Sequence, residues 1–257
     1  MLKSGYRKIW NACLQALEDG LPYIWVDTCC IEQGNHDEVA RNITSMYAYY
    51  QEAKICYAYL VDVDFNVSPL ESYDARLEFG LSVWFDRGWT LQELLAPSEV
   101  LFFNKEWFCI GSKVELRTMV CGATSIPTDV LSGQRPVHNV DPAQRMSWAM
   151  GRETTKPQDQ AYCLQGLLGV SIDPNYEEGV EQSFLRLRSS FLDAHPEHKE
   201  SLGAVKDLYQ FLNYTRHASS SHGGSYPISR QQYFRRPDLE TSPVNLFLPS
   251  FLPRYHT

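Results

Sequence analysis

The sequence lacks a long apolar run and carries few positive charges, and each deficit excludes a class of protein. No window reaches the roughly 18 uninterrupted apolar residues that a membrane-spanning helix requires, and the start of the chain lacks the apolar core of a signal peptide. The 23 Lys and Arg residues stand against 31 Asp and Glu residues, which gives a formal charge of −8. Nucleic acids and anionic membranes are bound by basic surfaces. We therefore expect no nucleic-acid partner and no membrane span.

Cysteine pairs with CxxC spacing are also absent. The seven cysteines are odd in number, and several lie inside apolar runs, where a reduced cysteine behaves as a small hydrophobic residue. This usage indicates a reducing, cytoplasmic compartment. His195 and His198 have a metal-like spacing, but no cysteine or histidine pair lies near them in the sequence, so we predict no metal site.

Three common catalytic signatures are missing as well. The sequence contains no GxGxxG, no P-loop and no GxSxG motif. Dinucleotide-binding folds, nucleoside triphosphatases and serine hydrolases usually depend on these motifs. Any activity of this chain must therefore be sought in a different arrangement of residues.

The first half of the chain alternates helical and strand patterns. Ile9, Cys13, Ala16 and Leu17 recur at helical spacing, and a short apolar run follows at 23–26. Residues 55–63 are apolar on both alternating faces, which is typical of a central parallel strand covered by helices on both sides. Residues 100–103 form a third strand pattern. We predict an α/β fold over residues 1–118, with an open, mostly parallel sheet flanked by helices.

The second half of the chain changes character twice. Helical patterns at 114–120, 143–152, 158–168 and 179–192 predict a helical extension, which we assign to residues 119–193. Residues 194–257 are rich in Ser, Pro and Gly, and we expect this tail to be poorly ordered.

The stretch SVWFDRGWTLQELLAP, residues 82–97, gathers polar and aromatic side chains around a short predicted helix. Trp89 and Glu93 are four residues apart and share one helix face. A flat indole beside a carboxyl group can stack a base or a nicotinamide ring and raise the pKa of the carboxyl by desolvation. The alternative is a solvated glutamate beside a core tryptophan.

Two further residues can join Glu93 in one crevice. Asp27 follows a buried strand, and ligands of open α/β sheets bind outside the carboxyl ends of the strands. Its alternative role is that of a cap or turn residue. Arg87 can pair with Asp27, with Asp86 or with a phosphate, and its alternative is a structural ion pair.

Together with YIWVDTCCIEQ at 23–33, the stretch at 82–97 resembles the fungal heterokaryon-incompatibility (HET) domain over roughly residues 5–190. HET domains serve non-self recognition and programmed cell death, and they look remotely like Toll/interleukin-1 receptor (TIR) domains. The resemblance therefore implies a TIR- or flavodoxin-like sheet. In TIR domains a serine, a tryptophan and a glutamate belong to an NAD-cleaving site, and here Ser82, Trp84 and Glu93 are the candidates.

The resemblance also implies a role for Glu93 and a departure from the family pattern. Glu93 would stabilise the oxocarbenium-like ribosyl cation as nicotinamide leaves NAD, which would be a substrate. HET domains normally open with a strand that carries Ser-His-Thr-Trp, and this sequence starts after that element. A sheet without that strand has an unpaired edge or a groove. The chain would then be a truncated product, a divergent member of the family, or a domain completed by a partner.

The resemblance implies two functions from different classes. The first is a death effector that hydrolyses NAD when clustered, with Glu93 as its catalytic residue. The second is a non-enzymatic signalling module, or an inactive remnant, that associates with other HET or sensor proteins. For the second function we expect exposed aromatic residues such as Tyr49 or Trp107 to make the contacts.

Overall fold

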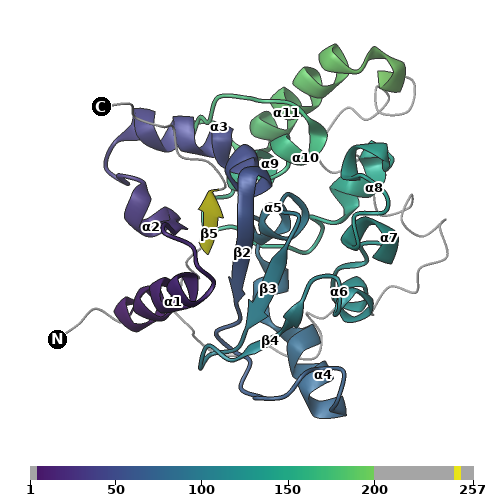
Figure 1. The fold of residues 1–257 in the computed structure, drawn as a ribbon. Helices are drawn as coiled ribbons and strands as arrows, with labels where there is room; N and C mark the ends of the chain where they lie inside the picture. Colours follow the sequence, from purple (N-terminus) through teal and green to yellow (C-terminus); the bar gives the residue numbers. More distant parts are fainter. Residues whose placement is uncertain (1–4, 200–245, 250–257) are drawn as a thin grey trace.

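The computed structural model describes residues 5–199 and 246–249, in which helices flank a single mixed β-sheet (Figure 1). The strand order is β1-β5-β2-β3-β4. The strands are β1 (Trp25–Val26), β2 (Ala53–Tyr59), β3 (Val100–Phe103), β4 (Cys109–Ser112) and β5 (Leu246–Pro249). The prediction of an α/β fold with strands near 23–26, 55–63 and 100–103 is confirmed.

The prediction of a mostly parallel sheet is wrong. Strands β2 and β3 are parallel, with Cys56 opposite Val100, but β5 runs antiparallel to both β1 and β2, and β4 runs antiparallel to β3. A parallel pair needs a long crossover connection, whereas the few residues between β3 and β4 allow only a hairpin. Neither β4 nor β5 was expected from the sequence.

Two helices of the first half, α3 and α4, start where a polar side chain caps the backbone. Asn35 accepts a hydrogen bond from the Glu38 amide at the start of α3, and Ser72 accepts one from the Ala75 amide at the start of α4. The elements are α1 (Tyr6–Glu18), α2 (Asp27–Cys30), α3 (His36–Glu52), α4 (Tyr73–Leu81), the 3₁₀ helix η1 (Val83–Asp86) and α5 (Thr90–Leu95).

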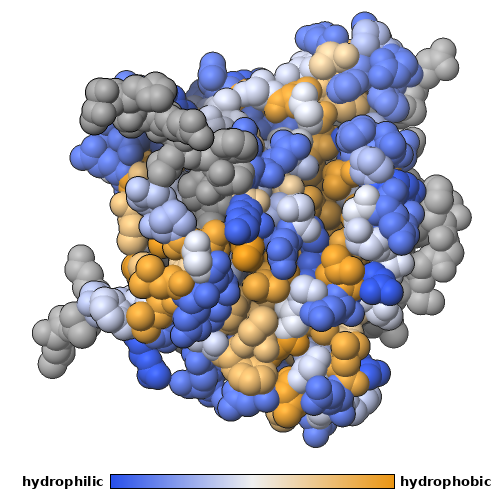
Figure 2. Space-filling model, in the orientation of Figure 1, coloured by the Kyte–Doolittle hydropathy of each residue, from blue (hydrophilic) through white to orange (hydrophobic). Residues whose placement is uncertain are grey.

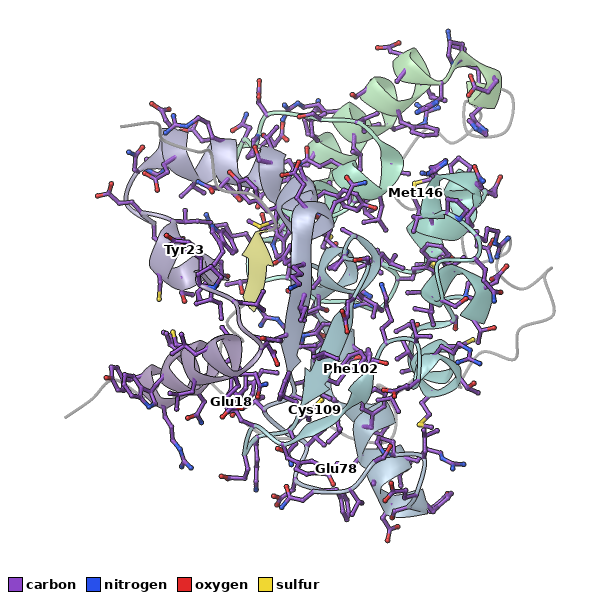
Figure 3. The ribbon with its side chains drawn as sticks, viewed as in Figure 1. Glu18, Tyr23, Glu78, Phe102, Cys109 and Met146 are labelled. Atoms are coloured by element: carbon purple, nitrogen blue, oxygen red, sulfur yellow. The ribbon has the colours of Figure 1, made fainter. Side chains whose placement is uncertain are left out.

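Side chains alternate between two apolar clusters on opposite faces of the sheet, as the strand period of two requires. On one face Tyr57 and Phe103 pack with Ala12 and Ala16 of α1. On the other face lies the larger core, which includes Cys56 and Phe102, and Figure 3 shows Phe102 on β3 in the middle of the molecule. Within α1 the predicted face is only partly correct, because Leu17 is 67% exposed.

The predicted helical extension is present and shares the larger core with the sheet. That core contains Ile43 from α3 and Leu192 from α11, so it crosses the predicted boundary at residue 118. Gly166 shows how closely the extension packs, because a Cβ atom there would lie 2.2 Å from the Cβ of Tyr47. The elements are α6 (Arg117–Thr124), α7 (Thr128–Leu131), η2 (Val137–Asn139), α8 (Pro142–Ser147), α9 (Asp159–Tyr162), α10 (Gln165–Leu168), α11 (Val180–Ala194) and η3 (Pro196–His198).

The predicted poorly ordered tail at 194–257 lies mainly outside the described residues. Of this tail, 246–249 form β5, the strand between β1 and β2. The resemblance to HET domains implied that the first strand of the family is missing. In a flavodoxin-like sheet the first strand of the chain lies between the second and the third strands. Strand β5 occupies the corresponding position with the opposite direction. Across the described part of the chain, no helix has both the length and the apolar character needed to cross a bilayer.

Candidate functional site

Glu93 lies on α5, a helix of six residues that are all buried. The Glu93 side chain is 1% exposed, so the interpretation as a solvated helix glutamate is wrong. Among the described residues, its Oε1 atom has no hydrogen-bond partner. Burial raises the pKa of this carboxyl group to about 8, because the charged form loses its hydration.

Three charged residues surround Glu93, and we call the four residues together the Glu93 cluster: Lys8, Asp27, Arg87 and Glu93. The positive charges of Arg87 and Lys8 lower the pKa of Glu93, but burial, which is the largest influence, and the negative charge of Asp27 both raise it. The structure thus supports the prediction that Asp27 at the end of β1 faces the same region as Glu93 and Arg87.

The two cations of the cluster are also affected by burial. Burial lowers the pKa of Lys8 to about 8, while Glu93 and Asp27 act in the opposite direction. The pKa of Arg87 is lowered for the same reason, and Glu93 and Asp27 again oppose the shift. Sequence reasoning missed Lys8, because it lies on α1, and no local pattern links α1 to α5.

Of the two tryptophans in the 82–97 stretch, Trp84 is the one beside Glu93. Its indole donates a hydrogen bond to the Glu93 carboxylate, which lowers the carboxyl pKa slightly against the effect of burial. The ring packs edge-on against Phe85 and Phe102. Trp89 instead donates from Nε1 to Asp159 Oδ2 at 3.1 Å, so it joins the motif to the helical extension.

Ser82 holds the turn that places Trp84. Its Oγ donates to Asp62 Oδ1 at 2.7 Å and accepts from the Trp84 amide at 3.3 Å, while the other Asp62 oxygen accepts from the Val83 amide at 2.9 Å. The Ser82 side chain is fully buried. In this structure Ser82 therefore acts as the cap of η1 and positions Trp84.

Residues of the helical extension hold the Arg87-Gly88-Trp89 turn in place through hydrogen bonds. Arg152 donates to the Arg87 carbonyl oxygen at 2.9 Å and to Thr90 Oγ1 at 3.1 Å. The Gly88 amide donates to the Glu153 carbonyl oxygen at 2.8 Å, and a Cβ atom at Gly88 would lie 2.5 Å from the Thr154 side chain. A larger residue at position 88 would therefore displace the Thr154 side chain.

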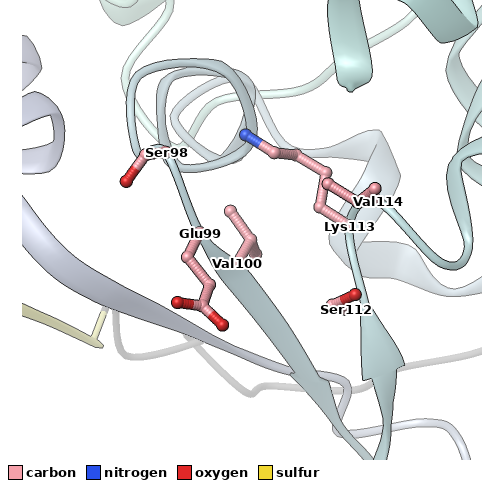
Figure 4. A pocket seen from close by; sticks show the side chains of 6 residues that line it. All are labelled: Ser98, Glu99, Val100, Ser112, Lys113 and Val114. Atoms are coloured by element: carbon pink, nitrogen blue, oxygen red, sulfur yellow. The ribbon is translucent and has the colours of Figure 1, made fainter. Parts of the chain in front are cut away.

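A separate surface cavity of about 390 Å³ lies beside β3 and β4 and does not include the Glu93 cluster (Figure 4). The Lys113 side chain extends from this cavity toward the end of α5, where Nζ donates to the Leu94 and Pro97 carbonyl oxygens at 3.1 and 2.7 Å. Lys113 thus caps α5 from its carboxyl end. The cavity is lined by Ser98, Glu99, Val100, Ser112, Lys113 and Val114.

No group of three or more His, Cys, Asp or Glu residues in the described ranges has the arrangement of a metal site. The Glu93 cluster has two acidic and two basic residues, and both Glu93 Oε1 and Arg87 Nε lack hydrogen-bond partners among the described residues. Buried polar atoms without partners are uncommon in proteins. The cluster can therefore offer one acceptor and one donor to a polar group that enters it.

Comparison with known proteins identifies the class. Residues 4–71 match the family model described as heterokaryon incompatibility protein (HET), and the chain is a HET-domain protein. It is also similar to the vegetative incompatibility protein HET-E-1 of Podospora anserina, with 40% identity over 187 residues. The similar stretch covers 72% of this chain and 14% of the Podospora protein. No solved structure matches the chain significantly.

Proposed function

We propose that this chain acts in heterokaryon incompatibility, as a module of non-self recognition that leads to cell death. The observation that carries the proposal is the 187-residue similarity to a vegetative incompatibility protein. A continuous stretch covering 72% of a 257-residue chain cannot avoid its middle, so it includes both Arg87 and Glu93. The chain spans only 14% of that protein, and the proposal concerns the part that the two share.

We further propose that the module cleaves NAD in the manner of TIR domains, with Glu93 as the catalytic carboxylate. Three observations support this role: the burial of Glu93, its unpartnered Oε1 atom, and its place beside Asp27 and Arg87. Buried carboxyl groups with strongly shifted pKa values concentrate at functional sites. Asp27 and Arg87 would orient the ribose and phosphate groups of NAD.

The protonation state of Glu93 restricts this mechanism. With a pKa of about 8, the buried Glu93 is mainly protonated at pH 7. Only an ionised carboxylate, however, stabilises a ribosyl cation. The nicotinamide ring of NAD is positively charged, and a positive charge beside a carboxyl group lowers its pKa. Bound NAD would thus lower the pKa of Glu93 and favour its ionised form, which the mechanism requires.

The burial of Glu93 supports the second function, that of a non-enzymatic module. Glu93 is 1% exposed, so the protein must open before NAD can reach the carboxyl group. A module that acts only through association with other HET or sensor proteins needs no such opening. The two functions differ in whether the Glu93 carboxylate is required.

One expression experiment distinguishes these functions. The chain, Glu93→Gln and Glu99→Gln are induced in a filamentous fungus, and growth and cellular NAD are measured together. Glu99 is an exposed glutamate near the same helix and serves as the matched control. We expect growth arrest with loss of NAD for the chain and for Glu99→Gln. For Glu93→Gln we expect a rate of NAD loss lower by roughly 100-fold or more, as for other lost electrostatic stabilisers of a transition state.

The other outcomes of this experiment are equally informative. Growth arrest without NAD loss that persists in Glu93→Gln contradicts NAD cleavage and supports the non-enzymatic module. Normal growth at a confirmed protein level contradicts the incompatibility proposal itself. Circular dichroism of purified Glu93→Gln separates loss of activity from loss of folding.

A further inference from the structure

The sheet contains a gap between β1 and β2 that a distant segment of the chain fills, and we call this gap the β5 slot. Among the described strands, β1 and β2 pair with β5 and not with each other. Phe247 of β5 lies opposite Trp25 on one side and Cys56 on the other. The backbone groups of β1 and β2 that face the slot therefore find their partners on a third strand.

Apolar residues line both faces of the strands that border the slot. Val26 and Tyr57 belong with Ala12 and Ala16 of α1 to the smaller apolar cluster, and Figure 2 shows apolar residues over α1, at the lower left. Cys56 lies in the larger core on the other face. An extended chain segment fits such a slot, because its backbone pairs with both neighbours and its side chains enter the two apolar clusters.

The connection between β5 and the rest of the described chain is long. Residues 200–245 separate Lys199 from the start of β5. These 46 residues span at most roughly 150 Å, whereas a domain of this length has a radius of gyration of about 18 Å. The length of the connection therefore allows β5 to reach the slot of a neighbouring copy.

We propose that the β5 slot is a binding site for the β5 strand of a second copy, so that two copies exchange β5 and complete each other's sheet. Every copy has the same slot and the same strand, so pairing between copies keeps the register of pairing within one copy. Reciprocal exchange closes the two copies into a symmetric dimer. Strand β5 contains no residue of the Glu93 cluster, and the proposal stands whether or not the chain cleaves NAD.

The extent of exchange depends on concentration, because the strand contacts are the same within one copy and between two copies. The difference in free energy is then mainly the entropy of joining two molecules. A segment tethered by a long connection has an effective concentration of about millimolar order or less. Exchange should therefore be rare at micromolar concentrations and extensive when copies are held together at local concentrations near millimolar.

Disulfide trapping in the full chain tests the exchange. Directly opposite residues of antiparallel strands have Cα atoms about 4.5–5.5 Å apart, a separation that a disulfide bridges. Phe247→Cys therefore places a thiol opposite the native Cys56. The native chain is mixed with the double variant Cys56→Ala, Phe247→Cys. In this mixture a disulfide between positions 56 and 247 joins two different copies.

The mixture is incubated at about 5 µM and at about 500 µM and is then oxidised briefly with copper phenanthroline. Oxidation is carried out near pH 8.5, because burial raises the pKa of the Cys56 thiol. Mass spectrometry of peptides distinguishes the 56–247 link from links among other cysteines. We expect this link between copies at the higher concentration, with a yield at least about tenfold lower at 5 µM. The single variant Phe247→Cys should form the link within one copy at 5 µM.

A variant that is one residue out of register provides the matched control. Leu248→Cys together with Cys56→Ala should give no link to Cys56 of the native chain, because a shift of one residue moves a side chain to the other face of the sheet. Equal links from positions 247 and 248 would indicate random collisions and overturn the proposal. A link within one copy but none between copies at 500 µM would show that β5 stays in its own sheet, which also overturns it.

A second pair of positions, across β1 and β5, guards against local effects of the substitutions. Trp25→Cys in one copy and Phe247→Cys in the other, both with Cys56→Ala, place thiols opposite each other. Strand β1 is at the edge of the sheet, so the change at position 25 leaves the pairing of β2 with β3 intact. Circular dichroism and thermal unfolding confirm the fold of each variant before mixing. Failure of both folded pairs to link between copies contradicts strand exchange.

Discussion

At the scale of single residues, Glu93 owes its shifted pKa to the complete burial of the short helix that carries it. Thr90, Gln92 and Glu93 are all polar, and each is at most 1% exposed. Thr90 donates to the Trp84 carbonyl oxygen, and Gln92 donates to the Cys163 carbonyl oxygen at 2.7 Å. Glu93 and Gln92 each retain one unpartnered oxygen atom among the described residues, but only Glu93 carries a group that can ionise.

The raised pKa of Glu93 predicts a pH dependence of stability. The folded state keeps this proton up to a pH of about 8, whereas the unfolded chain releases it near the ordinary value of 4.5. Between pH 5 and 8 the folded state therefore binds the extra proton, and the free energy of unfolding falls as the pH rises, by up to about 1.4 kcal/mol per pH unit. Glu93→Gln should lack this slope.

Urea unfolding of the chain and of Glu93→Gln at pH 5, 6, 7 and 8 provides the measurement. Burial lowers the pKa of Lys8 and of Lys113 from 10.5 to about 8, so both lysines are protonated in the folded and the unfolded state up to a pH of about 7. From there upward the unfolded state binds more protons at these lysines, and their contribution to the free energy of unfolding rises with pH. Both proteins carry the two lysines, so the difference between the two curves reports Glu93. Parallel curves for the two proteins would show that Glu93 titrates normally.

At the scale of elements, β5 decides the form of the sheet. Strands β1 and β2 do not pair with each other, and both pair with β5, which lies between them. The β1-α3-β2 segment alone would therefore leave a gap one strand wide. Strand β2, which borders that gap, is apolar on both faces, because Cys56 belongs to the larger core and Tyr57 to the cluster on the other face.

Proline substitution tests the contribution of β5. Phe247 lies opposite Trp25 on one side and Cys56 on the other. Phe247→Pro removes a backbone donor from the interior of the sheet, which we expect to lower the free energy of unfolding by on the order of 1–3 kcal/mol. Ser220→Pro, outside the described ranges, is the control. The free energy of unfolding is measured by chemical denaturation. Equal values for the two variants would contradict a structural role of β5.

At the scale of the whole molecule, the predicted α/β core and helical extension behave as one packed unit. The larger apolar core contains residues from Ile31 to Leu192. Trp89 and Asp159, separated by 70 residues, meet at 3.1 Å, and Tyr176 donates to the other Asp159 oxygen at 2.8 Å. A boundary near residue 118 is thus a change in the type of element and does not divide the core.

This shared core predicts a single cooperative unfolding transition. Calorimetry should show one transition with equal calorimetric and van't Hoff enthalpies. Gly166→Ala should lower its midpoint without splitting it, because the added Cβ collides with Tyr47, and we expect a loss of about 1–3 kcal/mol. Gly122→Ala, where a Cβ atom meets nothing within 4 Å, is the control. Two separate transitions would show that the core and the extension unfold independently.

The sequence by itself determined the family and the local elements. The strand patterns near 23–26, 55–63 and 100–103 depend on neighbours in the chain, and such patterns are visible without a structure. The stretch at 82–97 identified Glu93, Arg87 and Trp84, which the structure brings together. The match to the HET family model confirms the resemblance that these motifs indicated.

Other features depend on contacts between residues far apart in the sequence. Local patterns did not reveal that Lys8 would join the Glu93 cluster or that Trp89 would turn to Asp159. They also misjudged exposure: Tyr49 and Trp107, expected to be exposed, are half-buried, with Tyr49 packed against Trp25 and Trp107 against Phe103.

Strand order and direction belong to the same group of features. Phe247 of β5 pairs with Cys56, 191 residues earlier, and with Trp25, 222 residues earlier, and a period of two along one strand does not specify its neighbour. The sequence determined which segments can form strands and helices. Only the tertiary structure decided which strands are adjacent, which side chains face Glu93, and which apolar residues remain at the surface, because those outcomes depend on long-range packing.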